Sequence, residues 1–195
     1  MYGPRILGLN SNLTMIKFNV ASINSCTETE GPHNRLCIWF QGCDIHCKGC
    51  CNPDYQAFEA RHIILLEEIL SIVRESKERF DIEGVTYSGG EPTCQQNLPA
   101  LTRAIKSLGL GVISFTGRNY DDVRNLLEGV DMVLDGKFDA KEKETNRRLL
   151  GSSNQRILCL TDRYKDDISW FDINKNGKAV EVNLSDRIVF NGDKI

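Results

Sequence analysis

The stretch from Leu36 to Cys50 reads LCIWFQGCDIHCKGC, an apolar run that leads straight into closely spaced cysteines. Five consecutive apolar residues followed by a glycine-containing loop are typical of a buried strand, so the cysteines stand on the loop after that strand. With Cys51, four of the chain's eight cysteines lie within nine residues. In a reducing compartment, such clustering favours metal ligands or redox groups over disulfides.

The length and charge of the chain restrict the classes of function. Its 195 residues are enough for one substantial core, and its net charge of −3 gives no general attraction to nucleic acid or to an anionic membrane. We therefore expect no bulk nucleic-acid binding. No apolar run of about 18 residues appears, and the first residues lack the apolar region of a secretory signal. We expect a cytoplasmic protein with no membrane segment.

Strand-like and helix-like patterns alternate along the first 160 residues. Apolar residues recur at helical spacing between Ile63 and Phe80, and short apolar runs such as 84–87 indicate strands. Strand–helix repeats of this length predict a parallel sheet with right-handed crossovers, so that the loops after the strands meet on one rim. Strands are expected at 15–20, 36–40, 84–87, 111–115, 131–134 and 156–160, and helices at 63–80, 98–108 and 119–127.

The pattern changes after about residue 160. Residues 170–173 and 179–182 flank the pair Asn176-Gly177, and an Asn-Gly pair between alternating segments predicts a β-hairpin. The sequence therefore predicts a core domain of residues 1–160 and a β-rich tail of residues 161–195.

Cys43, Cys47 and Cys50 have the spacing C-x3-C-x2-C. Three thiolates cannot complete a structural zinc site, which takes four ligands, although Cys51 or His46 could supply the fourth. A zinc-binding interaction module is therefore one open alternative. A [4Fe–4S] cluster held by three thiolates instead leaves its fourth iron open for an exogenous ligand, an arrangement suited to chemistry. The scattered cysteines elsewhere form no second triplet, so a single cluster is expected.

The segment Ser88-Gly89-Gly90-Glu91-Pro92 follows the strand expected at 84–87. Glycines lack Cβ, so they let backbone carbonyls approach a ligand closely and allow positive φ. A C-x3-C-x2-C loop followed about forty residues later by Gly-Gly-Glu resembles the radical S-adenosylmethionine (SAM) superfamily. That resemblance implies an α/β fold, a partial (β/α)6-type barrel, to which the C-terminal β-hairpin is attached as a tail.

Within that superfamily the chain resembles the anaerobic ribonucleoside-triphosphate reductase activating enzymes, a branch of the glycyl-radical enzyme activases. The resemblance covers about residues 16–160. It implies a [4Fe–4S] cluster and SAM as cofactors, and the large subunit of an anaerobic ribonucleotide reductase, a glycyl-radical enzyme, as partner. It also implies an electron donor such as flavodoxin or ferredoxin. The residues that carry the resemblance are Glu30-Gly31-Pro32, Arg35, Gly49-Cys50, Asn52, Thr116-Gly117, 133–138 and 151–155.

The resemblance also implies a reaction and roles for residues of this chain. Reductive cleavage of SAM would give methionine and a 5′-deoxyadenosyl radical, and this radical would remove a hydrogen atom from a glycine of the partner. Cys43, Cys47 and Cys50 are implied as cluster ligands. The implied SAM contacts are Gly89, Gly90 and Glu91 at the methionine end, Thr116 near the ribose, and Asp135 and Lys137 beside the carboxylate, with a monovalent cation in some related activases.

Three positions depart from the pattern of the resembling enzymes. His33-Asn34 stands where those enzymes often have a glycine, and Cys51 and Arg118 stand where aromatic residues are common. The resemblance implies that the first change falls in a segment that contacts the partner. It implies that the other two alter the adenine pocket or add a redox-active or anion-binding group. They leave a second alternative open, a stand-alone radical SAM enzyme that modifies a peptide, a nucleotide or a small molecule.

Overall fold

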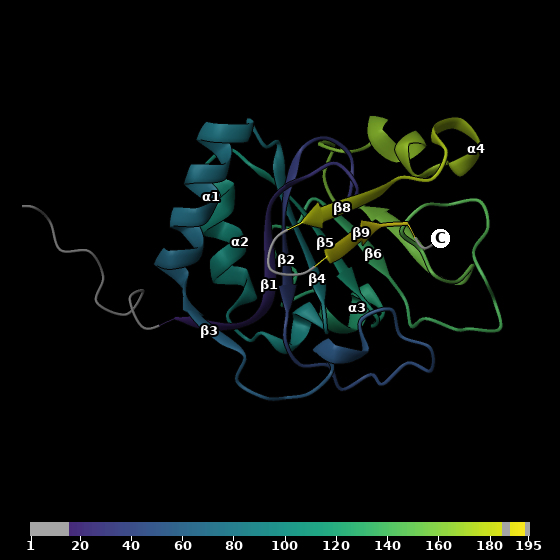
Figure 1. The fold of residues 1–195 in the computed structure, drawn as a ribbon, viewed down its shortest axis with the longest axis horizontal. Coiled ribbons are helices and arrows are strands. Elements are labelled where there is room, and N and C mark those ends of the chain that lie inside the picture. Colours follow the sequence, from purple (N-terminus) through teal and green to yellow (C-terminus); the bar gives the residue numbers. More distant parts are fainter. Residues whose placement is uncertain (1–15, 185–187, 194–195) are drawn as a thin grey trace, which may run out of the picture.

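The computed structural model describes residues 16–184 and 188–193. Seven strands of these residues form one mixed sheet in the order β3-β1-β2-β4-β5-β6-β7, and β8 and β9 form a separate two-stranded sheet (Figure 1). The α/β class with a large sheet is confirmed, while the partial barrel stays a prediction. The strands are β1 Lys17–Thr27, β2 Arg35–Phe40, β3 His62–Leu65, β4 Gly84–Gly89, β5 Gly111–Thr116, β6 Met132–Asp135, β7 Arg156–Cys159, β8 Val180–Leu184 and β9 Ile188–Gly192.

The four strands at the centre of the sheet run parallel. β2, β4, β5 and β6 pair in that order, with Arg35 opposite Gly84 and Phe40 opposite Gly89 in the first pair. Helices α1 (Leu66–Phe80), α2 (Leu98–Ser107) and α3 (Tyr120–Val123) lie in the connections between these strands. The carboxyl ends of the four strands therefore share one rim, as the sequence predicted.

The edges of the sheet are antiparallel. β1 pairs antiparallel with both β2 and β3, and β7 pairs antiparallel with β6. The prediction that residues 156–160 continue the parallel sheet is therefore wrong. Residues 136–155 form turns and bridges rather than a crossover helix, so the chain folds back and returns in the opposite direction.

Two of the predicted helices are shorter than the sequence pattern suggested. Residues 62–65 form β3, which pairs with residues 17–20 of β1, and α1 begins only at Leu66. The β-branched residues Ile63 and Ile64 favour this strand over another helical turn. α3 ends at Val123 instead of residue 127. None of the helices in the described residues is long and apolar enough to cross a membrane.

Both faces of the sheet are covered. On β2, Leu36, Ile38 and Phe40 belong to the large core under α1 and α2, whereas Cys37 and Trp39 face the opposite side. A strand buried on both faces reads as a continuous apolar run, which explains the composition of residues 36–40. A second core joins the sheet to later parts of the chain through Ile113, Met132, Leu134, Leu150, Tyr164 and Phe171.

The tail contains a hairpin, but not at the predicted place. Residues 166–171 form a 3-10 helix and residues 173–176 form the short helix α4. Gly177, with φ of 68°, ends α4 rather than turning a hairpin. The hairpin is β8–β9, which pairs Val180 with Gly192 and crosses in front of the large sheet in Figure 1. Its turn lies outside the described residues.

Candidate functional site

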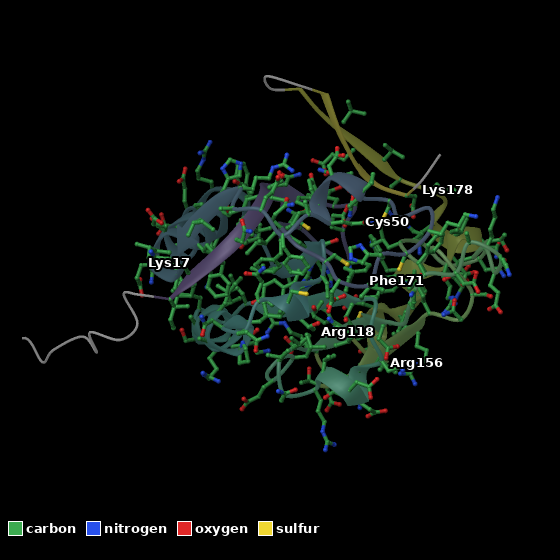
Figure 2. The ribbon with its side chains drawn as sticks, turned by 90° about the horizontal axis from the view of Figure 1, so that it is seen from below. Lys17, Cys50, Arg118, Arg156, Phe171 and Lys178 are labelled. Atoms are coloured by element: carbon green, nitrogen blue, oxygen red, sulfur yellow. The ribbon has the colours of Figure 1, made fainter. Side chains whose placement is uncertain are left out.

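The motif loops meet on the rim at the carboxyl ends of the parallel strands, which Figure 2 shows from below. The backbone N–H of Gly90 donates to Phe40 O at 2.8 Å, and that of Glu91 donates to Gly42 O at 2.9 Å. These bonds join the Gly-Gly-Glu loop after β4 to the start of the cysteine loop after β2. Two motifs about forty residues apart in the sequence are therefore in direct backbone contact.

The two glycines of this loop are required by close packing. A Cβ on Gly89 would lie 2.4 Å from Phe40 N, and a Cβ on Gly90 would lie 2.4 Å from Gly42 O. Gly89 also has φ of 103°, a conformation that residues with a side chain rarely adopt. The sequence argument explained the glycines by the approach of a ligand, and the structure adds a second cause, the approach of the cysteine loop.

Backbone N–H groups point at the sulfurs of the three motif cysteines. The buried Cys43 sulfur accepts from the N–H groups of Ile45 and His46, and the half-buried Cys47 sulfur accepts from that of Phe138. The Cys50 sulfur accepts from Asn52 N at 3.4 Å. N–H groups directed at sulfur are one of the features by which proteins tune the potential of iron–sulfur clusters.

The donor set therefore fits an iron–sulfur cluster. Burial raises the pKa of the Cys43 and Cys47 thiols, and the N–H groups directed at both sulfurs oppose that rise because they stabilise the thiolate form that binds iron. Among the residues that the structure describes, no three His, Cys, Asp or Glu side chains converge closely enough to hold a single metal ion. In a four-iron cluster each thiolate binds a different iron, so the three sulfurs need not converge on one point.

Glu91 is the buried centre of the rim. One of its carboxylate oxygens accepts from Thr93 N, Thr93 Oγ1 and Thr116 Oγ1 at 3.0, 2.6 and 2.8 Å, and the other accepts from Gly117 N at 2.9 Å. The side chain is 1 % exposed. Glu91 thereby ties the loop after β4 to the loop after β5, and it places the predicted residue Thr116 beside it.

Asp135 is also buried, at the end of β6. Its carboxylate accepts from Arg156 Nε and from Tyr120 N, each at 2.8 Å, and it forms a second, shorter contact with Arg156. Arg156 stands opposite Asp135 in the β6–β7 register. Lys137, two residues later, is exposed and reaches the rim. Sequence reasoning missed Arg156, because only the antiparallel register of β7 places it there.

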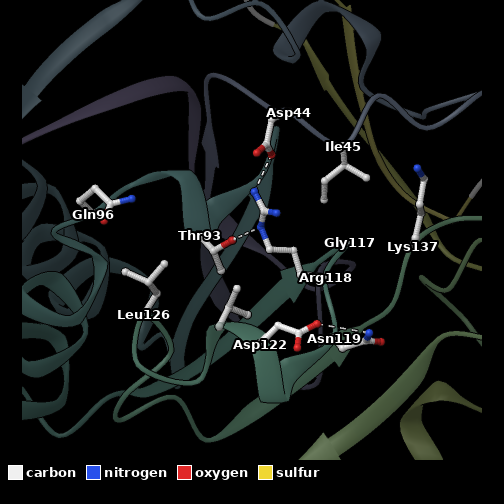
Figure 3. A pocket seen from close by; sticks show the side chains of 11 residues that line it. Asp44, Ile45, Thr93, Gln96, Gly117, Arg118, Asn119, Asp122, Leu126 and Lys137 are labelled. Atoms are coloured by element: carbon white, nitrogen blue, oxygen red, sulfur yellow. Dashed lines mark hydrogen bonds and ion pairs between the residues drawn. The ribbon is translucent and has the colours of Figure 1, made fainter.

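An open groove of about 590 Å³ lies on the rim beside these loops (Figure 3). Arg118 crosses it and forms an ion pair with Asp44 at 2.5 Å, which lowers the pKa of the Asp44 carboxyl. Sequence reasoning had marked Arg118 only as a departure and had missed Asp44. The groove is lined by Asp44, Ile45, Thr93, Gln96, Gly117, Arg118, Asn119, Asp122, Val123, Leu126 and Lys137.

A cysteine loop with N–H groups directed at its sulfurs, packed against a Gly-Gly-Glu loop on the rim of a parallel sheet, fits the class of iron–sulfur proteins with an α/β fold. The family model described as "4Fe-4S single cluster domain" matches residues 29–158. The chain belongs to this family.

Relatives of the chain carry names that agree with this family. The chain is 26 % identical over 151 residues to the anaerobic ribonucleoside-triphosphate reductase-activating protein of Enterobacteria phage T4, covering 74 % of this chain and 96 % of that protein. It is 29 % identical to the protein of that name from Vibrio cholerae, covering 67 % and 91 %. These names confirm the resemblance to the radical SAM activating enzymes that the motifs indicated.

Two further comparisons cover shorter parts of the chain. It is 32 % identical over 124 residues to the pyruvate formate-lyase-activating enzyme of Clostridium pasteurianum, covering 62 % of this chain and 52 % of that enzyme. The chain thus spans about half the length of that relative. The crystal structure of QueE from Escherichia coli overlays with a TM-score of 0.46 at 16 % identity, covering 54 % of this chain and 55 % of that one.

Proposed function

We propose that the protein is a radical SAM enzyme that installs a glycyl radical on an anaerobic ribonucleoside-triphosphate reductase. The observation that carries this proposal is the set of three motif cysteines whose sulfurs each accept a backbone N–H, packed against the Gly-Gly-Glu loop. The match to nearly the whole length of the phage T4 activating protein supports the choice of reaction. When bound, a [4Fe–4S] cluster supplies the electron that splits SAM into methionine and a 5′-deoxyadenosyl radical.

The residues of this chain hold and position the reactants. Cys43, Cys47 and Cys50 bind the cluster, and the open groove beside them admits SAM. Lys137 lines that groove and acts on Cys47 as a nearby positive charge, so it is suited to bind the carboxylate of SAM.

The buried carboxylates have a different task. Both oxygens of Glu91 already accept hydrogen bonds from the protein, and Asp135 is held by Arg156 and Tyr120. We assign both carboxylates to the organisation of the loops that surround SAM. Gly89, Gly90 and Thr116 contact SAM from the same rim, and a monovalent cation beside Asp135 stays an expectation.

The partner and the setting follow from the same proposal. The partner is a glycyl-radical enzyme, and the electron donor is a flavodoxin or a ferredoxin of the cytoplasm. The sheet serves as a partial barrel whose rim faces the partner's glycine. Residues 1–160 form the catalytic unit, and residues 161–195 are attached to it.

The test is anaerobic reconstitution with iron and sulfide, followed by dithionite, SAM and quantification of 5′-deoxyadenosine. We expect the nucleoside from the unmodified protein and none from Cys43→Ala. Cys26→Ala, which removes a half-buried thiol on β1, is the matched control and is expected to retain activity. Binding of zinc alone, or activity in Cys43→Ala with a full cluster, would refute the proposal.

A second arm tests the substrate. Addition of an anaerobic ribonucleoside-triphosphate reductase should produce the electron paramagnetic resonance signal of a glycyl radical on that protein. Formation of the nucleoside without this signal would favour the stand-alone enzyme that modifies another substrate.

A further inference from the structure

Arg118 connects the cysteine loop to two other loops of the rim. Its Nη2 lies 2.5 Å from Asp44 Oδ1, and its Nε donates to Thr93 Oγ1 at 3.1 Å. Its backbone N–H donates to Thr116 Oγ1 at 3.1 Å. Figure 3 shows the guanidinium standing between Thr93 and Asp44. One side chain from the end of β5 thus reaches the residue that follows Cys43.

The segment held by this ion pair carries the N–H groups that point at Cys43. Asp44 is followed directly by Ile45 and His46, whose N–H groups donate to the Cys43 sulfur. His46 has φ of 49°, in the left-handed region that residues other than glycine seldom adopt. A loop in such a conformation needs support from the surrounding structure. The ion pair supplies that support one residue after the first cysteine of the motif.

The ion pair contributes little to overall stability. The side chains of Arg118 and Asp44 are 31 % and 51 % exposed, and exposed pairs add little to the free energy of unfolding because water screens them. A hydrogen-bonded contact between a guanidinium and a carboxylate nevertheless fixes a definite geometry. We therefore expect loss of the ion pair to change the local conformation of the cysteine loop and the binding of a ligand by that loop.

We infer that Arg118 is a positioning residue, which acts through Asp44 to hold residues 44–46 so that their N–H groups meet the Cys43 sulfur and retain the cluster. This inference rests on the proposed function, because it assigns the cluster to the three cysteines. It gives a purpose to the arginine that stands where the resembling enzymes often have an aromatic residue. Residues that orient metal ligands typically affect metal affinity by about 10- to 100-fold.

The experiment compares Arg118→Gln, Asp44→Asn and the double variant Asp44→Arg with Arg118→Asp. After anaerobic reconstitution, iron and sulfide per chain, the rate of cluster loss to a chelator, and the midpoint potential are measured. We expect each single variant to lose its cluster about tenfold faster or more. The double variant restores the opposite charges and should recover most of the retention. Arg79→Gln breaks an exposed ion pair with Glu75 on α1 and serves as the matched control.

A measurement on the cluster-free protein separates this inference from the proposed function. Amide hydrogen exchange of residues 44–46 should be faster in Arg118→Gln than in the unmodified protein, and unchanged in Arg79→Gln. Failure of the unmodified protein to assemble any cluster would overturn the proposed function. Unchanged exchange and unchanged cluster loss in Arg118→Gln would overturn the inference, as would a double variant that is no better than the single ones.

Discussion

The two ends of the parallel strands carry buried side chains of opposite charge. At the amino ends, Arg35 is fully buried and donates to Thr86 Oγ1, Glu83 Oε2 and the Tyr164 hydroxyl. At the carboxyl ends, Glu91 is buried and accepts from the loops that follow β4 and β5. Each charged group satisfies its hydrogen bonds within the protein, as burial of a charge requires.

The two groups differ in what they join. Arg35 connects the sheet to Tyr164, so the amino end is closed by the segment that follows β7. Glu91 connects the loop after β4 to the end of β5 and the loop that follows it, and a groove stays open beside them. The comparison teaches that the chain closes the amino end of the sheet and leaves the carboxyl end open, which is the end where ligands bind in parallel α/β sheets.

The largest expected effect is that of Arg35→Met on stability. The change removes the donor from the buried acceptors Thr86 Oγ1, Val85 O and the Tyr164 hydroxyl, although Glu83 keeps its ion pair with Arg163. Buried acceptors left without a donor should together cost about 4 kcal/mol. The free energy of unfolding is measured by chemical denaturation of the cluster-free protein. Arg79→Met removes an exposed pair and should cost less than about 0.5 kcal/mol. If both variants lost the same free energy of unfolding, the buried Arg35 would contribute no more to stability than an exposed arginine, which would contradict this expectation.

The second effect concerns the pH dependence of stability at the same end. Burial raises the pKa of the Glu30 carboxyl from 4.5 to about 7; Asp193 and Glu181 add to the rise, and the N–H of Gly192 opposes it. The folded protein therefore holds a proton that the unfolded chain releases above pH 4.5, so stability should fall as the pH rises from about 4.5 to 7.

For a rise in pKa from 4.5 to about 7, the fall in the free energy of unfolding is on the order of 3 kcal/mol. Glu30→Gln keeps the shape of the side chain and removes its titration. The free energy of unfolding of this variant should therefore not show the fall between about pH 4.5 and 7. Denaturation midpoints at pH 5, 6, 7 and 8 for both proteins check the expectation. If stability changed with pH in the same way in both proteins, the Glu30 carboxyl would be ionised in the folded protein throughout this range, and the expectation would be wrong.

The third prediction concerns Glu91, at the carboxyl ends of the parallel strands. Glu91→Gln places an amide N–H₂ against donors that now face a carboxylate, so it should cost about 2 kcal/mol of stability. It should also lower 5′-deoxyadenosine production more than Arg35→Lys does, because Glu91 lies at the rim and Arg35 lies at the opposite end of the strands. Glu128→Gln, whose side chain is highly exposed, is the control. A larger loss of activity in Arg35→Lys would contradict the division between the two ends.

The smallest effect is expected for Tyr164→Phe. Its hydroxyl accepts from Arg35 at 2.9 Å and donates to Glu83 at 2.6 Å, and the ring stays in the second core. Loss of the hydroxyl should cost about 1 kcal/mol. Iron content after reconstitution should match that of the unmodified protein. A clear loss of iron would show that the two ends are coupled.

The sequence predicted the parts of the fold that rest on short-range patterns. The strand before the cysteines follows from the apolar run 36–40, and the meeting of the cysteine loop with Gly90 and Glu91 follows from parallel pairing of β2 and β4. The relation between loops and strand ends holds for any parallel sheet. Sequence patterns alone therefore place the motif residues on one rim.

Contacts that depend on register or on long-range pairing could not be predicted. Arg156 meets Asp135 only because β7 runs antiparallel to β6, and no local pattern distinguishes that direction. Asp44 and Arg118 are 74 residues apart in the chain and have no shared periodicity. Residues 63–65 satisfied a helical pattern, yet they form part of the strand that pairs with β1, because strand pairing outweighs the helical preference of so short a segment.

Several contacts that hold the cysteine loop come from later in the chain. Gly90 and Glu91 bond to its first residues, Arg118 holds Asp44, and Phe138 donates to Cys47. During synthesis the amino-terminal part emerges first, so the three cysteines leave the ribosome well before these partners. The loop acquires its full set of contacts only when the chain through Phe138 has been made and folded. The loop with all these contacts can therefore receive a cluster only after the sheet has been translated.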